Sequence, residues 1–568
     1  MPASSEAPAG APLSRGWLVS LWAGVGLTLA AGLFLPDLNY SDAPQYAVIA
    51  LRMFRDHDYL NLTSTGVGDY LDKPHLLFWS ALAGFRLLGV HDYSYRLASV
   101  LVSLLGAFAV GRLGRRLHGP RAGQLAALAF ITAQTILLGD HDVRTDALLT
   151  GFTALGTWLL VRWLDEGDLS SLLGGAAAMG LAVSSKGMVA VAVAGPALLL
   201  YSLGRGRLGR LLSPRLLLGL AAFLVALAPV LIAYYLQFDL HPEKEVLGAT
   251  GVSGVRFFLY DQSARRFGGG EGEAAAGDHL FFFHSLLWAF LPWSLLLYAA
   301  WGRRLGELWR GGLRAFRAVE ELSFLWPLAF VALMGFSRFK LPHYLNVLVP
   351  MLAVLVAGYL VALEREGRAR ALRVLERLQW AVVAVLLLGG AVLNGWAFPV
   401  RSPWVAAGAA PLLALLVLSF RLRDPLQRAW VPSAAAILLV NFALDASFYP
   451  QLAEYQPGSA FARRALALGL DPDRTWFLDT LYRPFQFYTG REIQLADLPQ
   501  LEREAASGRP TFVLVGEKGR RELLQAGVPS RELASSPDCR ITMLSWALLD
   551  PSTRGEACPR AHLLALGR

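Results

Sequence analysis

Long apolar runs recur along most of this chain, and they constrain its fold more than any other feature. A helix needs about 20 mostly apolar residues to cross a bilayer, because about 30 Å of hydrocarbon is covered at 1.5 Å per residue. Such runs lie near residues 16–35, 96–113, 122–139, 146–163, 170–184, 188–203, 216–236, 284–301, 322–336, 343–363, 379–398, 404–420 and 430–448. They predict an α-helical polytopic membrane protein with about 13 transmembrane helices.

Composition agrees with a membrane protein and excludes several other classes. Of the 568 residues, 55% are hydrophobic and 17% are charged, whereas a soluble domain has about 25% charged residues. Most of the chain must therefore face lipid, which rules out a disordered, collagen-like, coiled-coil or small disulfide-rich protein. The net charge is +9, but no basic run or aromatic-basic stripe is typical of a nucleic-acid surface, so we expect no nucleic-acid partner.

Two apolar runs need a separate interpretation. The run at 16–35 could belong to a cleaved signal peptide, because Ala30-Ala31-Gly32 is a stretch of small residues. Its length and the many runs that follow favour a transmembrane helix instead. The run at 76–90 is apolar but short, so we expect an interfacial or re-entrant segment there.

The distribution of arginine predicts the orientation in the membrane. Short alternate loops near 112–121, 205–215, 303–317, 365–377 and 421–428 are rich in arginine. Short loops with an excess of Lys and Arg lie on the cytoplasmic side. An odd number of spans that begins with a cytoplasmic N-terminus places the C-terminus outside.

The last part of the chain has the composition of a soluble domain. We expect a membrane domain over 1–450 and an external α/β domain over 451–568, with strands at 475–478, 511–515 and 541–544 and helices at 497–507 and 517–526. Cys539 and Cys558, the only two cysteines of the chain, both lie in this part. An oxidising compartment lets such a pair form a disulfide, which agrees with an external domain.

Two predicted external loops, 36–95 and 237–283, are too long to be simple connections and are expected to be functional. The first contains Asp42, Tyr46 and the sequence Asp72-Lys73-Pro74. Asp42 could equally be a helix N-cap, since a proline follows closely. The Asp72-Lys73 pair could be an exposed ion pair before a proline.

Lysine is rare but is placed consistently. The chain has five lysines against 47 arginines, and Lys73, Lys186, Lys244, Lys340 and Lys518 all fall on the predicted external side. An ammonium group is a compact point charge that suits a phosphate. This placement favours an external anionic ligand.

Other ionisable residues gather at predicted helix ends. Asp140, Asp142, Arg144 and Asp146 lie near the outer ends of two spans, where charge is costly unless it is paired or faces a cavity. The simpler interpretation is helix capping by Thr145 or Asp146, together with an Asp140–Arg144 pair.

The second loop adds histidines and glycines. His279 and His284 could be ordinary interfacial residues, and the glycine-rich stretch 268–272 is typical of a hinge or lid. No His/Cys cluster has zinc-ligand spacing. Asp42, Asp72 and Asp146 could hold a divalent metal ion, although no spacing rule requires one.

These motifs, in this order, resemble the GT-C fold glycosyltransferases that use lipid-linked sugars. The resemblance is to the ArnT-like lipid A aminoarabinose transferases, with protein O-mannosyltransferases as more distant relatives. Their first-loop pattern is Asp-Glu-x-x-Tyr followed by Glu-Lys-Pro-Pro, and here these read Asp42-Ala43-Pro44-Gln45-Tyr46 and Asp72-Lys73-Pro74-His75. The likeness continues through Arg96-Leu97-Ala98-Ser99, Ser185-Lys186-Gly187, Arg265-Arg266-Phe267, Leu291-Pro292-Trp293 and Lys340-Leu341-Pro342-His343-Tyr344.

The chain departs from the family pattern at four positions. Ala43 replaces an acidic residue, Gln45 a basic one, Asp72 a longer glutamate, and Gln262 a glutamate of the second loop. These departures bear on metal use and on the identity of the donor and acceptor.

The resemblance implies an enzyme of the bacterial inner membrane with a periplasmic active site. It would move a sugar from a polyprenyl-phosphate donor to a lipid A-like lipid, a protein or an envelope glycan. An inverting displacement needs a general base and positive charge for the leaving phosphate. The implied residues are Asp42 as base, Asp146 as a second catalytic carboxylate, Lys73, Lys340 and Arg266 as phosphate partners, and Asp72, Tyr46, Tyr344 and His279 in support of the acceptor.

Two other classes remain open at this point. A transporter or flippase of lipid-linked sugars has a similar number of spans, but such proteins show internal repeats and charge near the bilayer centre, and neither is evident here. A sensor or assembly protein that keeps the fold without the chemistry is suggested by Ala43 and Gln45.

Overall fold

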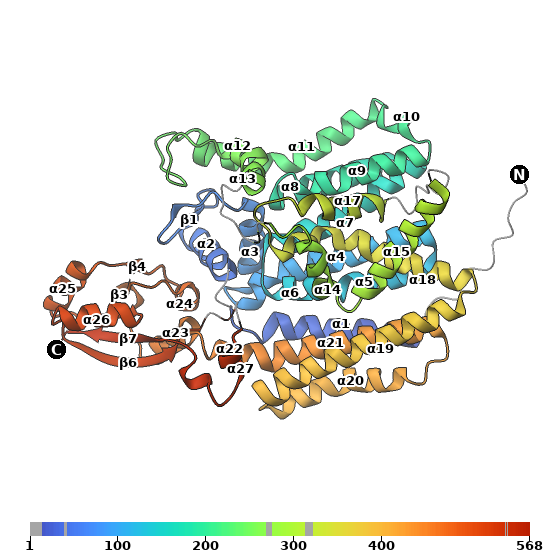
Figure 1. Cartoon of the computed structure of the whole chain (residues 1–568). Helices are drawn as coiled ribbons and strands as arrows, with labels where there is room; N and C mark the ends of the chain where they lie inside the picture. The colour runs from blue at the N-terminus through green and yellow to red at the C-terminus, as the bar shows by residue number, and fades with distance from the viewer. Residues whose placement is uncertain are drawn as a thin grey trace, which may run out of the picture.

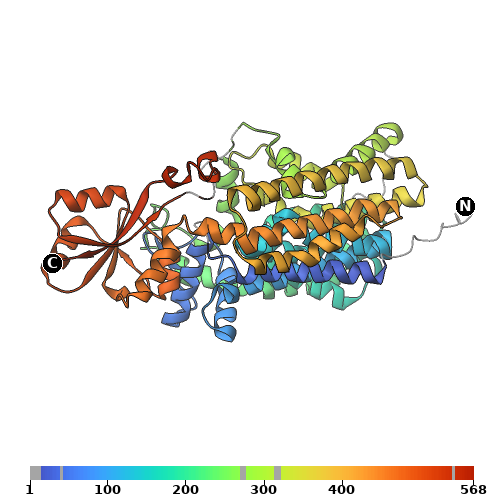
Figure 2. The same cartoon turned by 90° about the horizontal axis from the view of Figure 1, so that it is seen from below.

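The computed structural model describes residues 14–38, 42–268, 275, 277–312, 322–539, 541 and 544–567, without the side chains of 266–268. A bundle of long helices occupies most of the molecule, and a small sheet domain extends from one end of it (Figures 1 and 2). The first helix begins at the opposite end of the bundle from that domain. The architecture is therefore a helical bundle with a small C-terminal α/β domain, as the sequence predicts.

The helices of the bundle lie on the predicted apolar runs, except for the short α10. In chain order they are α1 (Arg15–Phe34), α4 (Asp92–His118), α5 (Pro120–Ile131), α6 (Gln134–His141), α7 (Thr145–Glu166), α8 (Leu169–Lys186), α9 (Val189–Gly204), α10 (Leu208–Leu211), α11 (Arg215–Tyr234), α14 (Phe281–Ala289), α15 (Ser294–Gly311), α17 (Leu325–Met334), α18 (Val349–Arg365), α19 (Ala369–Ala391), α20 (Pro403–Ser419) and α21 (Pro425–Ala443). Short π- or 3₁₀-helical segments extend several of them, at η1 (Tyr235–Asp239), η4 (Pro342–Leu348), η5 (Val392–Ala397) and η6 (Leu444–Phe448).

Fewer of these helices are long enough to span than the sequence predicts. Within the described ranges, seven helices meet the length and composition of a span, or eight if the bent pair α5–α6 is one span. The predicted run at 122–139 bends by 50° between α5 and α6, and the run at 284–301 is interrupted between α14 and α15 around Leu291-Pro292. Proline cannot donate the helical hydrogen bond, which agrees with the break at Pro292, whereas the bent run at 122–139 contains no proline.

Buried ion pairs join helices at the arginine-rich end of the bundle. Gly119, with φ of 97°, ends α4, and Pro120 begins α5 in the position where a missing N–H costs nothing. The next residue, Arg121, is buried and forms ion pairs with Glu364 at the end of α18 and Asp424 before α21. Removing either partner would leave buried charge uncompensated, so this contact fixes the relative position of three helices.

The first external loop folds into its own small core against the bundle. It contains α2 (Asp42–Asp56), the two-residue strands β1 (Thr63–Ser64) and β2 (Gly68–Asp69), and α3 (His75–Leu88). Tyr46, Met53, Phe78 and Phe85 are buried there together with Phe487 of the C-terminal domain. The predicted short apolar segment at 76–90 is therefore a helix, α3, which packs against α2 and α4.

The second external loop lies beside the first. It contains α12 (Gly254–Arg256), η2 (Phe257–Asp261) and α13 (Gln262–Gly268). Gln237 and Lys244 bind Asp69 of β2, at 3.1 Å and 3.0 Å respectively. The two long loops are thus connected by polar contacts at one end of the bundle.

The C-terminal domain is a five-stranded mixed sheet in the order β4-β3-β5-β7-β6. Its elements are α22 (Tyr449–Ala453), α23 (Pro457–Ala467), η7 (Pro472–Arg474), β3 (Thr475–Leu478), α24 (Arg483–Thr489), β4 (Gln494–Leu495), α25 (Leu498–Ala506), β5 (Thr511–Val515), α26 (Glu517–Gln525), β6 (Ser530–Pro537), α27 (Trp546–Leu549), η8 (Arg554–Glu556) and β7 (Arg560–Leu566). Strands β3, β4 and β5 are parallel, and β7 pairs antiparallel with both β5 and β6.

Two of the three predicted strands match the sheet, and the third is wrong. The predictions at 475–478 and 511–515 coincide with β3 and β5, whereas Ile541 and Leu544 lie outside any strand and 542–543 are not among the described residues. The sequence interpretation missed β6, because its polar residues lack an alternating apolar pattern. Cys539, just after β6, and Cys558, just before β7, form a disulfide, as the sequence allowed.

Candidate active site

Polar residues from distant parts of the chain meet at the end of the bundle that carries the C-terminal domain. Asp42 is the first residue of α2, and its side chain is 55% exposed. Its Oδ2 atom lies 3.7 Å from Nη1 of Arg144, which directly precedes α7. Asp42 is thus the first residue of a helix, where the capping interpretation expected an N-cap, and it also faces a cation from another segment.

Arg144 is the centre of this polar network. Its Nε donates to Asp142 Oδ2 at 2.9 Å, and its Nη1 approaches Nδ1 of His343 at 3.5 Å. Burial alone would lower the pKa of Arg144, but Asp142 and Asp42 outweigh this effect and raise it, so the guanidinium stays charged. The expected Asp140–Arg144 pair is wrong, because Asp140 instead accepts a hydrogen bond from Ser103 at 2.6 Å.

A second ion pair lies deeper in the bundle. Lys186 is the last residue of α8, and its Nζ lies 2.6 Å from Oδ1 of Asp146 in the first turn of α7. Both side chains are nearly buried, with exposures of 10% and 3%. The ammonium group also lies 5.0 Å from the ring centre of Tyr344. Asp146 and Tyr344 are thus brought together by a lysine that links three elements.

A third pair lies on the first external loop. Asp72 and Lys73 form an ion pair, and the amide nitrogen of Gln262 donates to both the backbone oxygen of Asp72 at 2.7 Å and its Oδ1 at 3.1 Å. A glutamate at position 262 would bring a second carboxylate against Asp72. An amide is therefore the side chain that fits this contact, which explains one departure from the family pattern.

Tyr46 joins the first and third pairs. The Lys73 ammonium lies 5.9 Å from the Tyr46 ring centre, and the Tyr46 hydroxyl shares a hydrogen bond with Tyr70. Burial, and then the nearby Tyr70 and Asp42, raise the pKa of Tyr46 well above its usual value. The phenol therefore remains a neutral hydrogen-bonding group at physiological pH.

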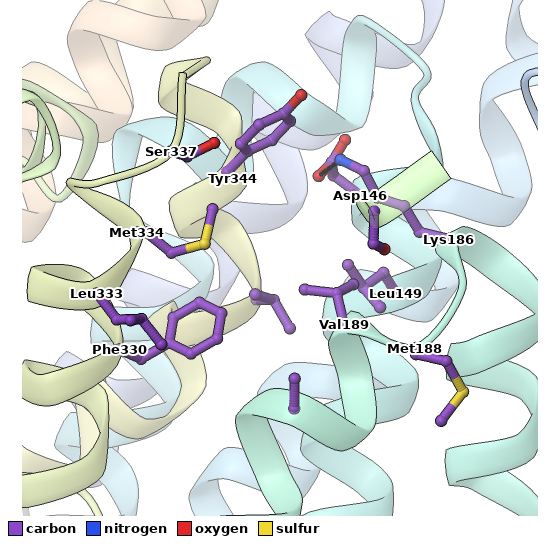
Figure 3. Close-up of a pocket in the computed structure, with 13 residues that line it drawn as sticks. Asp146, Leu149, Lys186, Met188, Val189, Phe330, Leu333, Met334, Ser337 and Tyr344 are labelled. Atoms are coloured by element: carbon purple, nitrogen blue, oxygen red, sulfur yellow. Dashed lines mark hydrogen bonds and ion pairs between the residues drawn. The ribbon is translucent and has the colours of Figure 1, made fainter. Parts of the chain in front are cut away.

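A cavity of about 320 Å³ opens beside the Asp146–Lys186 pair. Asp146, Lys186, Tyr344 and Ser337 lie at one end of it (Figure 3), Ser263 also contributes to the lining, and the other lining side chains are apolar. The apolar lining comes from Leu149, Met188, Val189, Ala192, Phe330, Leu333, Met334 and Val347. Such a cavity suits a ligand with a polar head and a hydrocarbon tail.

Not every predicted site residue joins this network. Lys340 is buried, and its Nζ donates to the backbone oxygen of Ala275 at 2.9 Å. His279 binds the backbone oxygen of Gly335 through Nδ1 at 3.2 Å and lies against Phe336. Arg266 lies at the end of α13, and its side chain is outside the described part of the chain.

The carboxylates suggested as metal ligands each face a cation or an amide. Asp42 lies near Arg144, Asp72 binds Lys73, and Asp146 binds Lys186. Among the residues that the structure describes, no group of three or more His, Cys, Asp or Glu side chains could hold a metal ion.

The network includes residues besides Asp142 that the sequence interpretation did not assign to the site. They are Arg144, Lys186 and His343. Each belonged to a motif that the sequence interpretation considered. The only signal that favoured a ligand-binding role for any of them was the scarcity of lysine, which applies to Lys186. Their partners are 40 to 199 positions away in the chain, so no local pattern could have shown the contacts.

Comparison with known proteins identifies the class. A family model for dolichyl-phosphate-mannose-protein mannosyltransferases matches residues 72–233. The crystal structure of ArnT from Cupriavidus metallidurans bound to undecaprenyl phosphate has the same fold, with a TM-score of 0.74, 20% identity, and coverage of 97% of this chain and 98% of that one. The protein has the fold of the membrane-embedded GT-C glycosyltransferases.

Sequence relatives then define the family. The undecaprenyl phosphate-alpha-4-amino-4-deoxy-L-arabinose arabinosyl transferase of Pseudomonas aeruginosa is 30% identical over 427 residues, which are 69% of this chain and 74% of that relative. A relative of the same name from Pseudomonas fluorescens is 28% identical over 363 residues, 62% of this chain and 60% of that protein. The chain belongs to this ArnT-like family of polyprenyl-phosphate-sugar-dependent glycosyltransferases.

The buried Asp146–Lys186 pair leads to a test of stability. Lys186→Met would leave Asp146 unpaired inside the bundle, and breaking a buried pair typically costs about 3–5 kcal/mol. The double variant Lys186→Met/Asp146→Leu removes both charges and should recover most of that loss. Unfolding of the purified protein in detergent, followed by heat or denaturant, measures the difference.

A matched control is Lys244→Met, because the Lys244–Asp69 pair is more exposed and should be worth about 1 kcal/mol or less. If the double variant is no more stable than Lys186→Met, the loss of stability does not come from an unpaired Asp146 carboxylate.

Proposed function

We propose that this protein transfers a sugar from a polyprenyl-phosphate carrier to a lipid acceptor at the external face of the inner membrane. Membership of the ArnT-like family supports this function, since its named relatives use undecaprenyl phosphate-linked 4-amino-4-deoxy-L-arabinose. The observation that carries the proposal is the cavity with a polar end and apolar walls, together with the adjoining Asp42–Arg144 network. A lipid A-like acceptor is implied by the resemblance of the loop motifs to lipid A aminoarabinose transferases, and a protein or envelope glycan is the alternative acceptor.

The cavity and the first loop suit the two halves of the donor. A polyprenyl chain requires an apolar surface, which Val189, Phe330 and Leu333 supply. Its phosphate requires positive charge at the membrane surface, and we assign Lys73 to this role. An ammonium group has three donors, and Asp72 occupies one of them, so the others can reach phosphate oxygens.

Asp42 is proposed as the general base. In one displacement step, the acceptor hydroxyl oxygen attacks the anomeric carbon of the sugar while the bond from that carbon to the phosphate oxygen breaks. Asp42 takes the hydroxyl proton, and the polyprenyl phosphate leaves with the bonding electron pair. Arg144 holds one oxygen of Asp42 and leaves the exposed side of the carboxylate available to the acceptor.

Asp72 and Asp146 act by holding their lysines in place. Each carboxylate binds one ammonium group and thereby sets its direction. Positive charge arranged before the reaction stabilises the departing phosphate without reorganisation. Tyr46 and Tyr344 are proposed to shape the acceptor region, since each lies against one of these lysines.

Replacing the base tests this mechanism. Asp42→Asn keeps the size of the side chain but cannot accept the proton, so turnover should fall by about 10²- to 10⁴-fold. Transfer from labelled undecaprenyl phosphate-aminoarabinose to lipid A in proteoliposomes measures the rate. Asp56→Asn is the matched control, because Asp56 lies at the other end of α2 and binds Arg55.

Near wild-type turnover by Asp42→Asn would show that Asp42 is not the general base and only begins helix α2. Movement of the labelled donor across the membrane without transfer would instead support a flippase.

Donor binding gives a separate test of the phosphate partners. Lys73→Ala should raise the KM for the donor and weaken the binding of undecaprenyl phosphate by about 10-fold, the loss of one charge-assisted hydrogen bond of about 1.5 kcal/mol. Lys340→Ala should weaken binding as well if its ammonium group turns from Ala275 toward the donor. Lys518→Ala, in the exposed part of α26, is the control. Unchanged affinity for undecaprenyl phosphate would remove either residue from the site.

The proposed topology has a cytoplasmic N-terminus and a periplasmic C-terminal domain. A cysteine introduced at Lys518 should react with a membrane-impermeant maleimide in intact spheroplasts, whereas one at Gly206, in an exposed arginine-rich turn, should react only after lysis. The native cysteines are paired in the disulfide and provide little background. The reverse pattern of labelling would invert the topology and place the site on the cytoplasmic face.

A further inference from the structure

We propose that Tyr488, on helix α24 of the C-terminal domain, is a positioning residue for Asp42. The proposal rests on the assignment of Asp42 as the base and adds a role for the C-terminal domain in the same reaction. Tyr488 lies 446 positions from Asp42, so only the tertiary fold can connect them.

The Tyr488 hydroxyl makes two hydrogen bonds to the membrane domain. It accepts one from the backbone N–H of Leu38 at 2.8 Å and donates one to Oδ1 of Asp92 at 2.8 Å. Leu38 precedes the segment that leads into α2, and Asp92 is the first residue of α4. A single phenol therefore holds the chain just before Asp42 against a long helix of the bundle.

The neighbouring residue, Phe487, supports the chain on the other side of Asp42. Its ring lies 6.4 Å from that of Tyr95 and 6.2 Å from that of Phe85. The Tyr95 hydroxyl, which is fully buried, donates to the backbone oxygen of Ala43 at 3.0 Å. The backbone is thus held at Leu38 directly and at Ala43 through Tyr95, on either side of the proposed base.

Further contacts between the two domains fall on the same loop. Arg463 pairs with Asp37 at 2.7 Å, and Thr65 donates to Glu492 at 2.7 Å. These contacts place the C-terminal domain on the first external loop and not only at the end of the last span. They resist any rotation of that domain that would shift Tyr488.

The charge state of Tyr488 suits this role. Burial raises the pKa of its hydroxyl, and the carboxylates of Asp92 and Asp37 raise it further. The phenol therefore keeps the proton that it donates to Asp92. It can serve both contacts over the whole physiological pH range.

Accurate placement of a catalytic group has a large effect on rate. A displacement of about 1 Å at the reacting atoms can cost about 10²-fold, because the bound geometry no longer favours attack. Asp42 is exposed, and among the described residues its carboxylate has one ionic partner, Arg144 at 3.7 Å, so its location depends on the backbone that carries it. The contacts of Tyr488 and Phe487 supply that backbone restraint.

The test compares two tyrosines of the C-terminal domain. Tyr488→Phe removes both hydrogen bonds to the membrane domain and should lower kcat by about 10- to 100-fold with little change in donor KM. Tyr482→Phe is the matched control, because the Tyr482 hydroxyl also donates to a carboxylate, Asp538 Oδ2 at 2.8 Å, but within the C-terminal domain. The full-length protein is assayed in proteoliposomes with undecaprenyl phosphate-aminoarabinose and lipid A.

A second measurement does not depend on activity. Hydrogen exchange of the full-length protein should become faster in the amides of residues 42–50 in Tyr488→Phe and stay unchanged in Tyr482→Phe. If Tyr488→Phe does not yield folded protein, Phe487→Leu removes the ring contacts with Tyr95 and Phe85 while leaving the Tyr488 hydroxyl, and should show the same two effects more weakly.

The outcomes separate this proposal from the function on which it rests. Full activity and unchanged exchange in Tyr488→Phe, with an inactive Asp42→Asn, would overturn the positioning role and leave the general base intact. Equal losses of kcat in Tyr488→Phe and Tyr482→Phe would also overturn it, since they would reflect domain stability alone. An active Asp42→Asn would refute the assignment of Asp42 as the general base. Faster exchange of the α2 amides in Tyr488→Phe would still support the restraint by Tyr488.

Discussion

Charge buried inside a membrane protein must be paired, and this requirement organises both ends of the bundle. Several kcal/mol are lost for each ion that leaves water without a partner. Arg121 satisfies this condition with Glu364 and Asp424 at one end, and Lys186 does so with Asp146 at the other. Because these partners lie on different helices, each ion pair also fixes how the helices pack. The Lys186–Asp146 pair therefore both stabilises the bundle and places charged groups beside an apolar cavity.

The position of the site follows from the nature of a lipid-linked reactant. A polyprenyl chain remains among apolar side chains, while its phosphate and sugar remain near water. A cavity with apolar walls and a charged end satisfies both requirements at the surface of the bundle (Figure 3). The first external loop brings Asp42, Asp72 and Lys73 to this boundary, and the second loop supports it through Gln262. The C-terminal domain completes the arrangement by its contacts with Leu38 and Thr65.

Much of the architecture could be predicted because it depends on local composition. Each predicted apolar run lies on one helix or on two consecutive helices, and the C-terminal sheet contains the strands expected at 475–478 and 511–515. Breaks within the runs were less predictable, since the run at 122–139 contains no proline to mark the bend between α5 and α6. Strand β6 was missed for a related reason: its polar residues join the sheet only because β7 offers an edge with which to pair.

The sequence alone determined that the chain crosses a membrane, that its two long loops contain acidic residues and lysines, and that its motifs resemble those of lipid-linked-sugar glycosyltransferases. Apolar length and residue type are local properties, so they can be recognised without a structure. Only the tertiary structure decided that Arg144 faces Asp42, that Lys186 binds Asp146, and that Tyr488 holds Leu38 from 450 positions away. These contacts depend on how helices and domains pack in three dimensions, and no spacing along the chain encodes the distance between two side chains that folding brings together.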